Sequence, residues 1–417
     1  MFKTSFFWSL LLAVLSIFLM TACTGQESVE QNDKITIYVK HTNKNQFMQK
    51  YGIDYELEHP EVKIVVLDHE YSGDQKPDLI FVGGFESYKQ MVDEGLLAPL
   101  DSYLNRNRKE LDFYLESMIT TKGMEIFQTY TPETLYALPL SLYSGTLFYN
   151  KDLFDRYEIP YPSDFITWDE VIELAQRFPP KTVDGTPLYG LSTTALPVAF
   201  SYLAISAYFQ ELSLFDQTTW TMTVNTPEWR AIWEYFVPGM RAGHFQLGPD
   251  NPLPMEEHPF LLGQAAMIDH GILFIQKLVE QEQKGNVINW DVVTPPIQSR
   301  NHPKTSSYKI MESYGIASDS PNKDVVWDLL VFMIRRNPPV TEIAGRNLEH
   351  LYTLEYEYRP TVDRDISRLE FDIQQLASEQ LMAVVKEEKT LDEALQQLEM
   401  IGQHILNAFR VEKEATE

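Results

Sequence analysis

Short apolar runs alternate with polar, helix-like segments in the first hundred residues of the chain. Three runs, at 35–39, 62–67 and 76–82, have the length and the Val, Ile and Leu content of strands. A polar segment that ends at Glu58 separates the first two runs, and a helix is expected from Tyr88 to Glu94 after the third. A strand–helix–strand–strand–helix order predicts an open α/β sheet with crossover helices.

The rest of the chain continues this alternation and becomes mainly helical toward its end. Thr167 stands three positions before Glu170 at the start of WDEVIELAQRF, a capping-box spacing that predicts an amphipathic helix. The last hundred residues are charged and have a helical pattern. Other helices are expected at 198–212, 227–242, 257–264, 270–283 and 324–336, and other strands at 146–149, 291–297 and 314–318.

The first 22 residues have the pattern of a signal peptide. Lys3 supplies a positive start, an apolar run extends from Phe6 to Met20, and small residues lead up to Cys23. A run of this length is typical of a secretory signal and is short for a membrane span. Residues 23–33 are polar and without pattern, which indicates a flexible tether.

The end of this segment resembles the lipobox of bacterial lipoproteins. In that family the cysteine becomes the mature N-terminus and carries lipid, which here implies acylation of Cys23, with palmitate among the acyl groups. Met20 stands where the pattern favours leucine, and the alternatives are an ordinary cleaved signal peptide or a short anchor helix. Lipid on Cys23 would hold the chain at the extracytoplasmic face of the cell membrane.

The composition limits the partners and the chemistry. With 34 basic and 60 acidic side chains the formal net charge is −26, which repels phosphate backbones and predicts no nucleic-acid partner. Cys23 is the single cysteine, so neither an internal disulfide nor a cysteine-based metal site can form. At 417 residues the chain is long enough for two or three domains, or for two large lobes.

The motifs of several enzyme classes are missing from the sequence. It contains no GxxxxGK[ST] or GxGxxG phosphate loop, no HExxH, and no GxSxG around the serines of SLYSGT at 141–146. The nine histidines are scattered without metal-ligand spacing, and acidic pairs are too common to single out a catalytic one. The sequence therefore predicts no catalytic residue, no metal and no cofactor.

Six segments, in their order along the chain, resemble the family 1 extracellular solute-binding proteins, whose best-known members bind maltose and other sugars. The similarity includes Gly-Leu-Leu and Pro-Leu-Asp after the third strand, Tyr-Asn-Lys-Asp-Leu-Phe at 149–154, and Gly-Gln-Ala-Ala-Met at 263–267, with Gln264 in place of the usual lysine. The six segments are 77–104, 138–154, 167–178, 260–271, 314–334 and 389–398.

This resemblance implies a two-lobed α/β fold of the periplasmic-binding-protein type, with three hinge crossings and a ligand cleft between the lobes. The crossings would lie near 140–143, 294–296 and Arg346. The resemblance also implies a monomeric subunit that delivers a small solute, a sugar or an oligosaccharide, to the permease subunits of an ABC importer. The lobes would consist of 34–141 with 297–345 and of 142–296 with 346–417.

Candidate ligand-binding residues lie in the loops after the first and third strands. His41 and Asn43 lie at the mouth of the first loop, where the alternative is an ordinary turn. In the second loop, Gly84 allows a ligand to approach the backbone closely. Phe85 offers a ring there, with a place in the core as its alternative.

Further candidates come from the resemblance. It places Tyr143 in a crossing strand, Asp269 and His270 after the Ala-Ala-Met segment, and Tyr314 at the start of a strand that lines the cleft in relatives, with the core as the alternative for Tyr314. Relatives often carry a tryptophan where this chain has Leu273, so we expect a main stacking ring from elsewhere. Tryptophans at helical spacing are expected in the core, namely Trp168, Trp229, Trp233 and Trp327.

Rings combined with polar groups favour a neutral carbohydrate, because a sugar has an apolar face and a rim of hydroxyls. A polyamine would need several carboxylates, and Asp269 is the one good candidate; iron carriers of related fold use adjacent tyrosines, and no Tyr-Tyr pair occurs. A cell-surface carbohydrate hydrolase would need two carboxylates roughly 5–10 Å apart. A sensor subunit that presents the ligand to a receptor is a further alternative, but the sequence favours a binding protein over an enzyme.

Overall fold

The computed structural model describes residues 34–69, 73–248, 254–360 and 363–416. The expected signal peptide and tether, with Cys23, lie outside the described residues. The chain divides into two compact units, one that ends at Pro77 and one that begins at Asp78.

The first unit is a strand–helix–strand motif. Its strands β1 (Ile35–Lys40) and β2 (Val62–Leu67) are parallel, with Ile35 opposite Val62. Parallel neighbours need a crossover, and here it consists of α2 (Lys44–Phe47), the π-helix η1 (Met48–Gly52) and α3 (Ile53–Glu58). The two predicted strands and the helix end at Glu58 are confirmed.

One sheet of the second unit is built around its longest strand, β12 (Lys309–Ile316). β3 (Leu79–Phe81) and β4 (Leu138–Tyr143) flank β12, and both are antiparallel to it. The strand predicted at 314–318 therefore exists but begins earlier, at Lys309.

The other sheet of this unit has the strand order β10, β5, β9, β6. β9 is antiparallel to β5 on one side and parallel to β6 on the other. The bounds are β10 (Trp290–Val293), β5 (Gly145–Asn150), β9 (Ala265–Gly271) and β6 (Tyr189–Thr193).

The chain passes directly between these two sheets. β4 ends at Tyr143 and β5 begins at Gly145, so the first passage takes place at Ser144. A second passage lies between β10 and β12, and it includes residues 294–296. A third connection leads from α13 (Lys323–Arg336) to α14 (Arg364–Val385).

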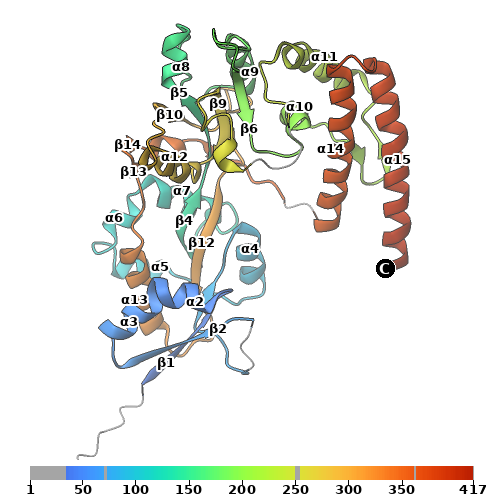
Figure 1. The fold of residues 1–417 in the computed structure, drawn as a ribbon. Helices are drawn as coiled ribbons and strands as arrows, with labels where there is room; N and C mark the ends of the chain where they lie inside the picture. The colour runs from blue at the N-terminus through green and yellow to red at the C-terminus, as the bar shows by residue number, and fades with distance from the viewer. Residues whose placement is uncertain (1–33, 70–72, 249–253, 361–362, 417) are drawn as a thin grey trace, which may run out of the picture. The chain divides into compact units, whose positions relative to one another are not determined.

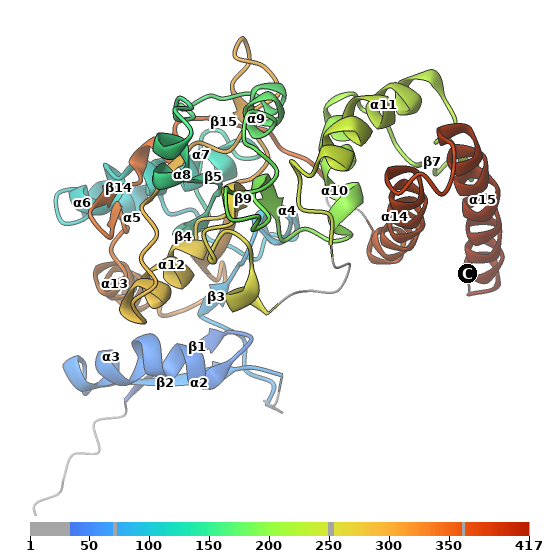
Figure 2. The same ribbon diagram turned by 45° about the horizontal axis from the view of Figure 1, so that its top comes forward.

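The remaining helices of the second unit are mostly short, apart from those near the C-terminus. α14 and α15 (Leu391–Thr416) lie side by side and pack against α10 and α11 (Figures 1 and 2). The other helices are α4 (Phe85–Asp93), α5 (Asp101–Arg106), α6 (Asp112–Leu115), α7 (Met118–Gln128), α8 (Lys151–Arg156), α9 (Trp168–Ala175), α10 (Val198–Phe209), α11 (Pro227–Ala242) and α12 (Phe274–Gln283). Short strands and 3₁₀ turns are β7 (Phe215–Asp216), β8 (Thr221–Met222), η2 (Met255–Glu257), β11 (Lys304–Thr305), β13 (Glu342–Ile343), β14 (Arg346–Asn347), η3 (Glu349–Tyr352) and β15 (Glu355–Tyr356).

Most of the local sequence signals produce the expected structure. The Thr167 hydroxyl accepts from the Glu170 amide at 3.3 Å while the Glu170 carboxylate accepts from the Thr167 amide at 2.8 Å, which confirms the capping box. Trp229, Trp233 and Trp327 are buried, as expected. Trp168 packs against the core but is only partly buried, so it is a core residue only in part.

The helix predicted at 257–264 is absent. A 3₁₀ turn ends at Glu257, Pro259 follows, and Gly263 has a φ of +70° that an α-helix does not use. α12 begins at Phe274 rather than at residue 270, because His270 and Gly271 still belong to β9.

Gly190 tests how closely β6 packs against α9. A Cβ atom at this position would overlap the backbone of Ala175, at the end of α9, and neither segment can move away without disturbing the core. We expect Gly190→Ala to lower the free energy of unfolding by roughly 1–3 kcal/mol, measured by urea denaturation. Gly84→Ala is the matched control, because the nearest atom to its new Cβ, the Ile310 oxygen, is 3.7 Å away. Equal midpoints for the two variants would contradict the close approach.

Candidate functional site

Two adjacent cavities lie at one edge of the sheet that contains β9. The Tyr143 cavity, of about 310 Å³, is lined by residues that include Tyr143, His270 and Lys309. The Tyr208 cavity, of about 370 Å³, is lined by residues that include Tyr208 and Trp168. Four residues line both cavities, namely Thr193, Ala195, Asp269 and Ser307.

The strand register explains why these side chains meet. β6 and β9 are parallel, and Thr193 at the end of β6 is opposite Asp269 near the end of β9. The carboxyl ends of both strands therefore lie at the same edge, which is where open α/β sheets bind ligands. On the other side of β9, Gly271 is opposite Gly145 at the start of β5.

Tyr143 is positioned by the absence of a side chain at Gly271. A Cβ atom on Gly271 would overlap the phenol ring and hydroxyl of Tyr143, so the ring packs directly on the backbone of β9. Tyr143 is partly buried, and burial together with the nearby charge of Asp269 raises the pKa of its hydroxyl. The hydroxyl remains protonated at neutral pH and can act as both donor and acceptor toward a ligand.

Asp269 is the central polar group of the site. Its side chain is partly buried at the junction of the two cavities, and burial raises the pKa of the carboxyl to about 7. None of the described residues forms a hydrogen bond or an ion pair with this carboxyl. A buried carboxyl without partners is unfavourable when ionised, and hydroxyl or amine donors of a ligand would relieve that cost.

His270 has a defined orientation beside Asp269. Its ring stacks on Phe274 at 4.7 Å, and its Nδ1 lies 3.2 Å from the backbone oxygen of Gly271. Because that oxygen can only accept, Nδ1 carries the proton, and burial lowers the pKa of the ring so that the neutral form is favoured. The Nε2 atom is then an acceptor.

The apolar wall of the Tyr208 cavity is one face of α10. Ser201, Ala204, Ile205 and Tyr208 recur at helical spacing along this face, and all four are only partly buried. The helix, VAFSYLAISAYF, is apolar around its whole circumference, a composition that is typical of a completely buried helix. The half-exposed face is therefore apolar surface that lacks a covering element.

Tyr208 is held at its hydroxyl and on one ring face. Its hydroxyl hydrogen-bonds to that of Ser306 at 2.7 Å. The Arg359 guanidinium lies 3.5 Å from the ring centroid, and Glu357 holds the guanidinium through an ion pair of 3.0 Å. Trp168, the first residue of α9, lines the same cavity.

The remaining predicted site residues have structural roles. The Asn43 side chain caps α2 by accepting from the Gln46 amide at 3.0 Å, and the Asn43 amide donates to Nδ1 of His41, whose ring contacts Phe47. These contacts fit the turn alternative, and neither His41 nor Asn43 is among the residues that line the two cavities.

Gly84, Phe85 and Tyr314 belong to the second unit but do not line the two cavities. Gly84 is the N-cap of α4. Phe85 packs against Tyr358, with ring centroids 4.9 Å apart, and not into either cavity. Tyr314 is 0% exposed and packs against Phe81, so its side chain offers no surface to a ligand. Packing thus gives Phe85 and Tyr314 the roles of buried or half-buried aromatics.

The structure therefore brings together Tyr143, Asp269 and His270, and it adds residues that sequence reasoning missed. Thr193, Ser307 and Lys309 reach the site through strand pairing and loops, for which the sequence carries no local signal. For the α10 side of the site the sequence does carry a signal, namely the apolar composition of this helix. A helix without a polar face needs a partner on every side, so a face that stays exposed indicates a binding surface.

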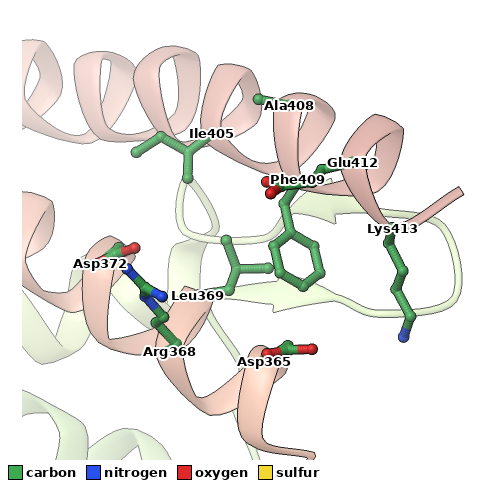
Figure 3. Close-up of a pocket in the computed structure, with 9 residues that line it drawn as sticks. All are labelled: Asp365, Arg368, Leu369, Asp372, Ile405, Ala408, Phe409, Glu412 and Lys413. Atoms are coloured by element: carbon green, nitrogen blue, oxygen red, sulfur yellow. The ribbon is translucent and has the colours of Figure 1, made fainter. Parts of the chain in front are cut away.

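A larger cavity, of about 540 Å³, lies elsewhere, between α14 and α15 (Figure 3). Leu369 and Phe409 point toward one another across it, and charged residues of both signs, among them Arg368 and Asp372, surround them (Figure 3). It contains none of the predicted site residues. The described residues include no group of His, Cys, Asp and Glu suited to a metal ion. In the same part of the chain, no helix has the length and apolarity needed to cross a membrane.

Comparisons with known proteins identify the family of this chain. Residues 40–336 match the model of the bacterial extracellular solute-binding protein family. A binding protein of Brucella abortus is 22% identical over 336 residues, which is 78% of this chain and 77% of that protein.

Solved structures give the same picture at the level of the fold. An extracellular solute-binding protein family 1 member from Alicyclobacillus acidocaldarius has a TM-score of 0.59 at 12% identity and covers 89% of this chain and 98% of its own. A sugar transporter from Rhizobium etli, in an open conformation, has a TM-score of 0.55 at 16% sequence identity. The match covers 89% of this chain and 99% of the transporter chain. The sugar-binding protein MalE from Xanthomonas citri has a TM-score of 0.52 at 18% sequence identity. The match covers 91% of this chain and 99% of the MalE chain.

The raised pKa of Asp269 makes stability depend on pH. An aspartate in an unfolded chain titrates near 3.9, whereas Asp269 titrates at about 7 in the folded chain. The folded state binds the extra proton between these values, so stability falls as the pH rises from about 4 to about 7 and then levels off. We expect Asp269→Asn to remove this loss and to be more stable than the wild type at pH 8 by on the order of 1–3 kcal/mol.

The measurement is urea denaturation from pH 4 to pH 8. Asp372→Asn, an exposed carboxylate on α14, is the control and should follow the wild-type curve. Parallel curves for wild type and Asp269→Asn would show that the Asp269 carboxyl is well solvated.

Proposed function

The chain belongs to the bacterial extracellular solute-binding proteins and has their two-lobed α/β fold. We propose that it is the substrate-binding lipoprotein of an ABC importer, and that its solute is a neutral sugar or oligosaccharide. It would capture the solute outside the cell and deliver it to the permease subunits. The proposal includes action as a monomer and no catalysis.

One observation carries the choice of a carbohydrate. An unpartnered carboxyl lies where two adjacent cavities meet, one lined by a phenol and an imidazole and the other by a half-exposed apolar face. Asp269 and His270 offer acceptors for hydroxyl hydrogens, and Tyr143 offers both a donor and an acceptor. Tyr208 and Trp168 supply aromatic surface for the apolar face of a sugar ring. The names of the Rhizobium and Xanthomonas proteins, a sugar transporter and a sugar-binding protein, point the same way.

The basic residues near the cavities support a neutral ligand. Lys304 pairs with Glu355 at 3.2 Å, and Arg359 pairs with Glu357. Lys309 lies exposed at the edge of the Tyr143 cavity. A single exposed lysine does not make the bidentate clamp that proteins use for carboxylates and phosphates.

The lobe boundaries are part of the proposal. We assign 34–141 with 297–345 to one lobe and 142–296 with 346–417 to the other. The passage of the chain between sheets at Ser144 supports the first crossing, near 140–143. Ligand that contacts both lobes only in a closed state would favour closure around it.

The N-terminal proposal can be tested in the native host. We expect the mature protein to begin at Cys23 and to carry lipid on it, because Cys23 follows a signal-peptide pattern. Cys23→Ser should leave the protein unprocessed or release it from the membrane. Intact mass of the native N-terminus decides the question, and a chain that still begins at Met1 with an unmodified Cys23 would rule the proposal out.

Saccharide binding is tested by a thermal-shift screen of the mature chain against a sugar and oligosaccharide panel, because a tight ligand stabilises the folded state by mass action. For any saccharide that binds, Tyr143→Ala should weaken affinity by on the order of tenfold to a hundredfold in titration calorimetry, since a ring contact and a hydrogen bond are lost. Tyr161→Ala, an exposed tyrosine outside both cavities, should leave affinity unchanged. Equal effects of the two variants would place the ligand elsewhere.

A polyamine or other cation is the second candidate, and the unpartnered Asp269 carboxyl is the observation that favours it. Salt distinguishes the two, because an ion pair with a cationic ligand is screened and hydrogen bonds to a neutral sugar are not. Asp269→Asn should weaken sugar binding modestly at both low and high salt. Steeply salt-dependent binding of a cation, without response to any saccharide, would replace the carbohydrate assignment.

A cell-surface hydrolase is the remaining alternative. Two carboxylates, Asp269 and Glu357, line the cavities, and Glu357 is held by Arg359. A glycosidase needs one carboxyl as acid and a second as base or nucleophile. Release of reducing ends from any bound saccharide would support this alternative.

A further inference from the structure

A third cavity adjoins the Tyr208 cavity on the far side of Trp168. This His302 cavity, of about 480 Å³, is lined by residues of α9, of α10 and of the 298–302 loop. Trp168, Ile205 and Phe209 line both cavities, so these three side chains form the boundary that the two cavities share.

α10 presents two neighbouring stripes to these cavities. Ser201, Ala204 and Tyr208 face the Tyr208 cavity, and Ser206 and Gln210 face the His302 cavity. Ile205 and Phe209, four positions apart on the same side of the helix, form the line between the stripes. From Ser201 to Gln210 the helix rises roughly 13 Å at 1.5 Å per residue. This is longer than a single pyranose ring.

The chemistry of the His302 cavity matches that of the carbohydrate site. Its lining combines apolar side chains, such as Trp168 and Ile172, with polar ones, namely Asp169, Ser206, Gln210, Gln298, Ser299 and His302. No lysine or arginine is among its lining residues, so it lacks the cationic clamp that an anionic ligand needs. Apolar and aromatic surface beside hydroxyl, amide, carboxylate and imidazole groups suits a sugar ring.

The loop that forms one wall is already folded. Gln298 donates to the backbone oxygen of Phe209 at 2.7 Å, which ties the loop to the end of α10. Arg300 pairs with Glu170 of α9 at 2.9 Å. His302 donates its backbone amide to Ser299 at 3.2 Å, which closes the turn. The wall therefore needs little ordering when a ligand binds, which favours affinity.

We infer that the ligand site continues over Trp168 into the His302 cavity and that the solute is an oligosaccharide chain long enough to occupy both sides of Trp168. The inference rests on the proposed function, since it assumes that the Tyr143 and Tyr208 cavities hold a saccharide. The evidence for this inference is that Trp168, Ile205 and Phe209 line both cavities. A saccharide chain that lies against these three side chains in one cavity can therefore continue directly into the other.

The test is calorimetry of the mature chain with the maltose-to-maltohexaose and cellobiose-to-cellohexaose series. Affinity should rise at least tenfold from the shortest to the longest member of the series that binds. The double variant Gln210→Ala, His302→Ala should lose most of that gain while its affinity for the disaccharide stays within twofold. His404→Ala, an exposed histidine on α15, should bind every length as the wild type does.

The outcomes separate the two proposals. Equal affinity for short and long chains, or an equal loss for all lengths in the double variant, would overturn the extended site and leave a saccharide-binding protein. Binding of neither series, with binding of other saccharides of single-unit size in the thermal-shift screen, would also overturn it. A protein that binds no saccharide of any length would overturn the proposed function, and the extended site with it.

Discussion

The position of β9 between an antiparallel and a parallel neighbour is the constraint on which the site depends. Ala265 to Ile268 are buried on both faces of the sheet, so a shift of one residue in register would turn every side chain of the strand over. With the register fixed, Asp269, His270 and Gly271 follow at the edge of the sheet. Gly271 then provides the flat backbone on which the Tyr143 ring rests.

This arrangement leaves the Asp269 carboxyl desolvated and without a hydrogen-bonding or ion-pair partner among the described residues. Burial raises the pKa of the Asp269 carboxyl and lowers that of the His270 ring, so both side chains tend toward their neutral forms. Neutral groups with open hydrogen-bonding positions recognise hydroxyls without a large desolvation cost. The ionised Asp269 carboxyl therefore lowers the free energy of unfolding above neutral pH, and hydrogen-bond donors of a ligand would stabilise this same group.

α10 likewise keeps apolar surface exposed at the candidate site. One side of the helix packs in the core with α11 and α14, through side chains such as Phe200 and Leu203. The other side, with Ile205, Tyr208 and Phe209, remains half-exposed and lines two of the cavities. Apolar surface that is kept open in a folded domain is typical of binding sites, because burying it within the protein would have stabilised the fold.

Local sequence patterns were enough to predict most of the helices and strands and the family. The β-branched runs predicted β1 and β2, the Thr167–Glu170 spacing predicted the start of α9, and ordered short motifs indicated a solute-binding fold, because each of these signals is local. Tyr143, Asp269 and His270 were found through the same motifs. The three-dimensional structure was needed to show that Tyr314 is in the core, that Asn43 caps a helix, and that Trp168 lines the Tyr208 cavity. The exposure of a side chain and its partners depend on strand register and on helix packing between segments far apart in sequence, and no local pattern records them.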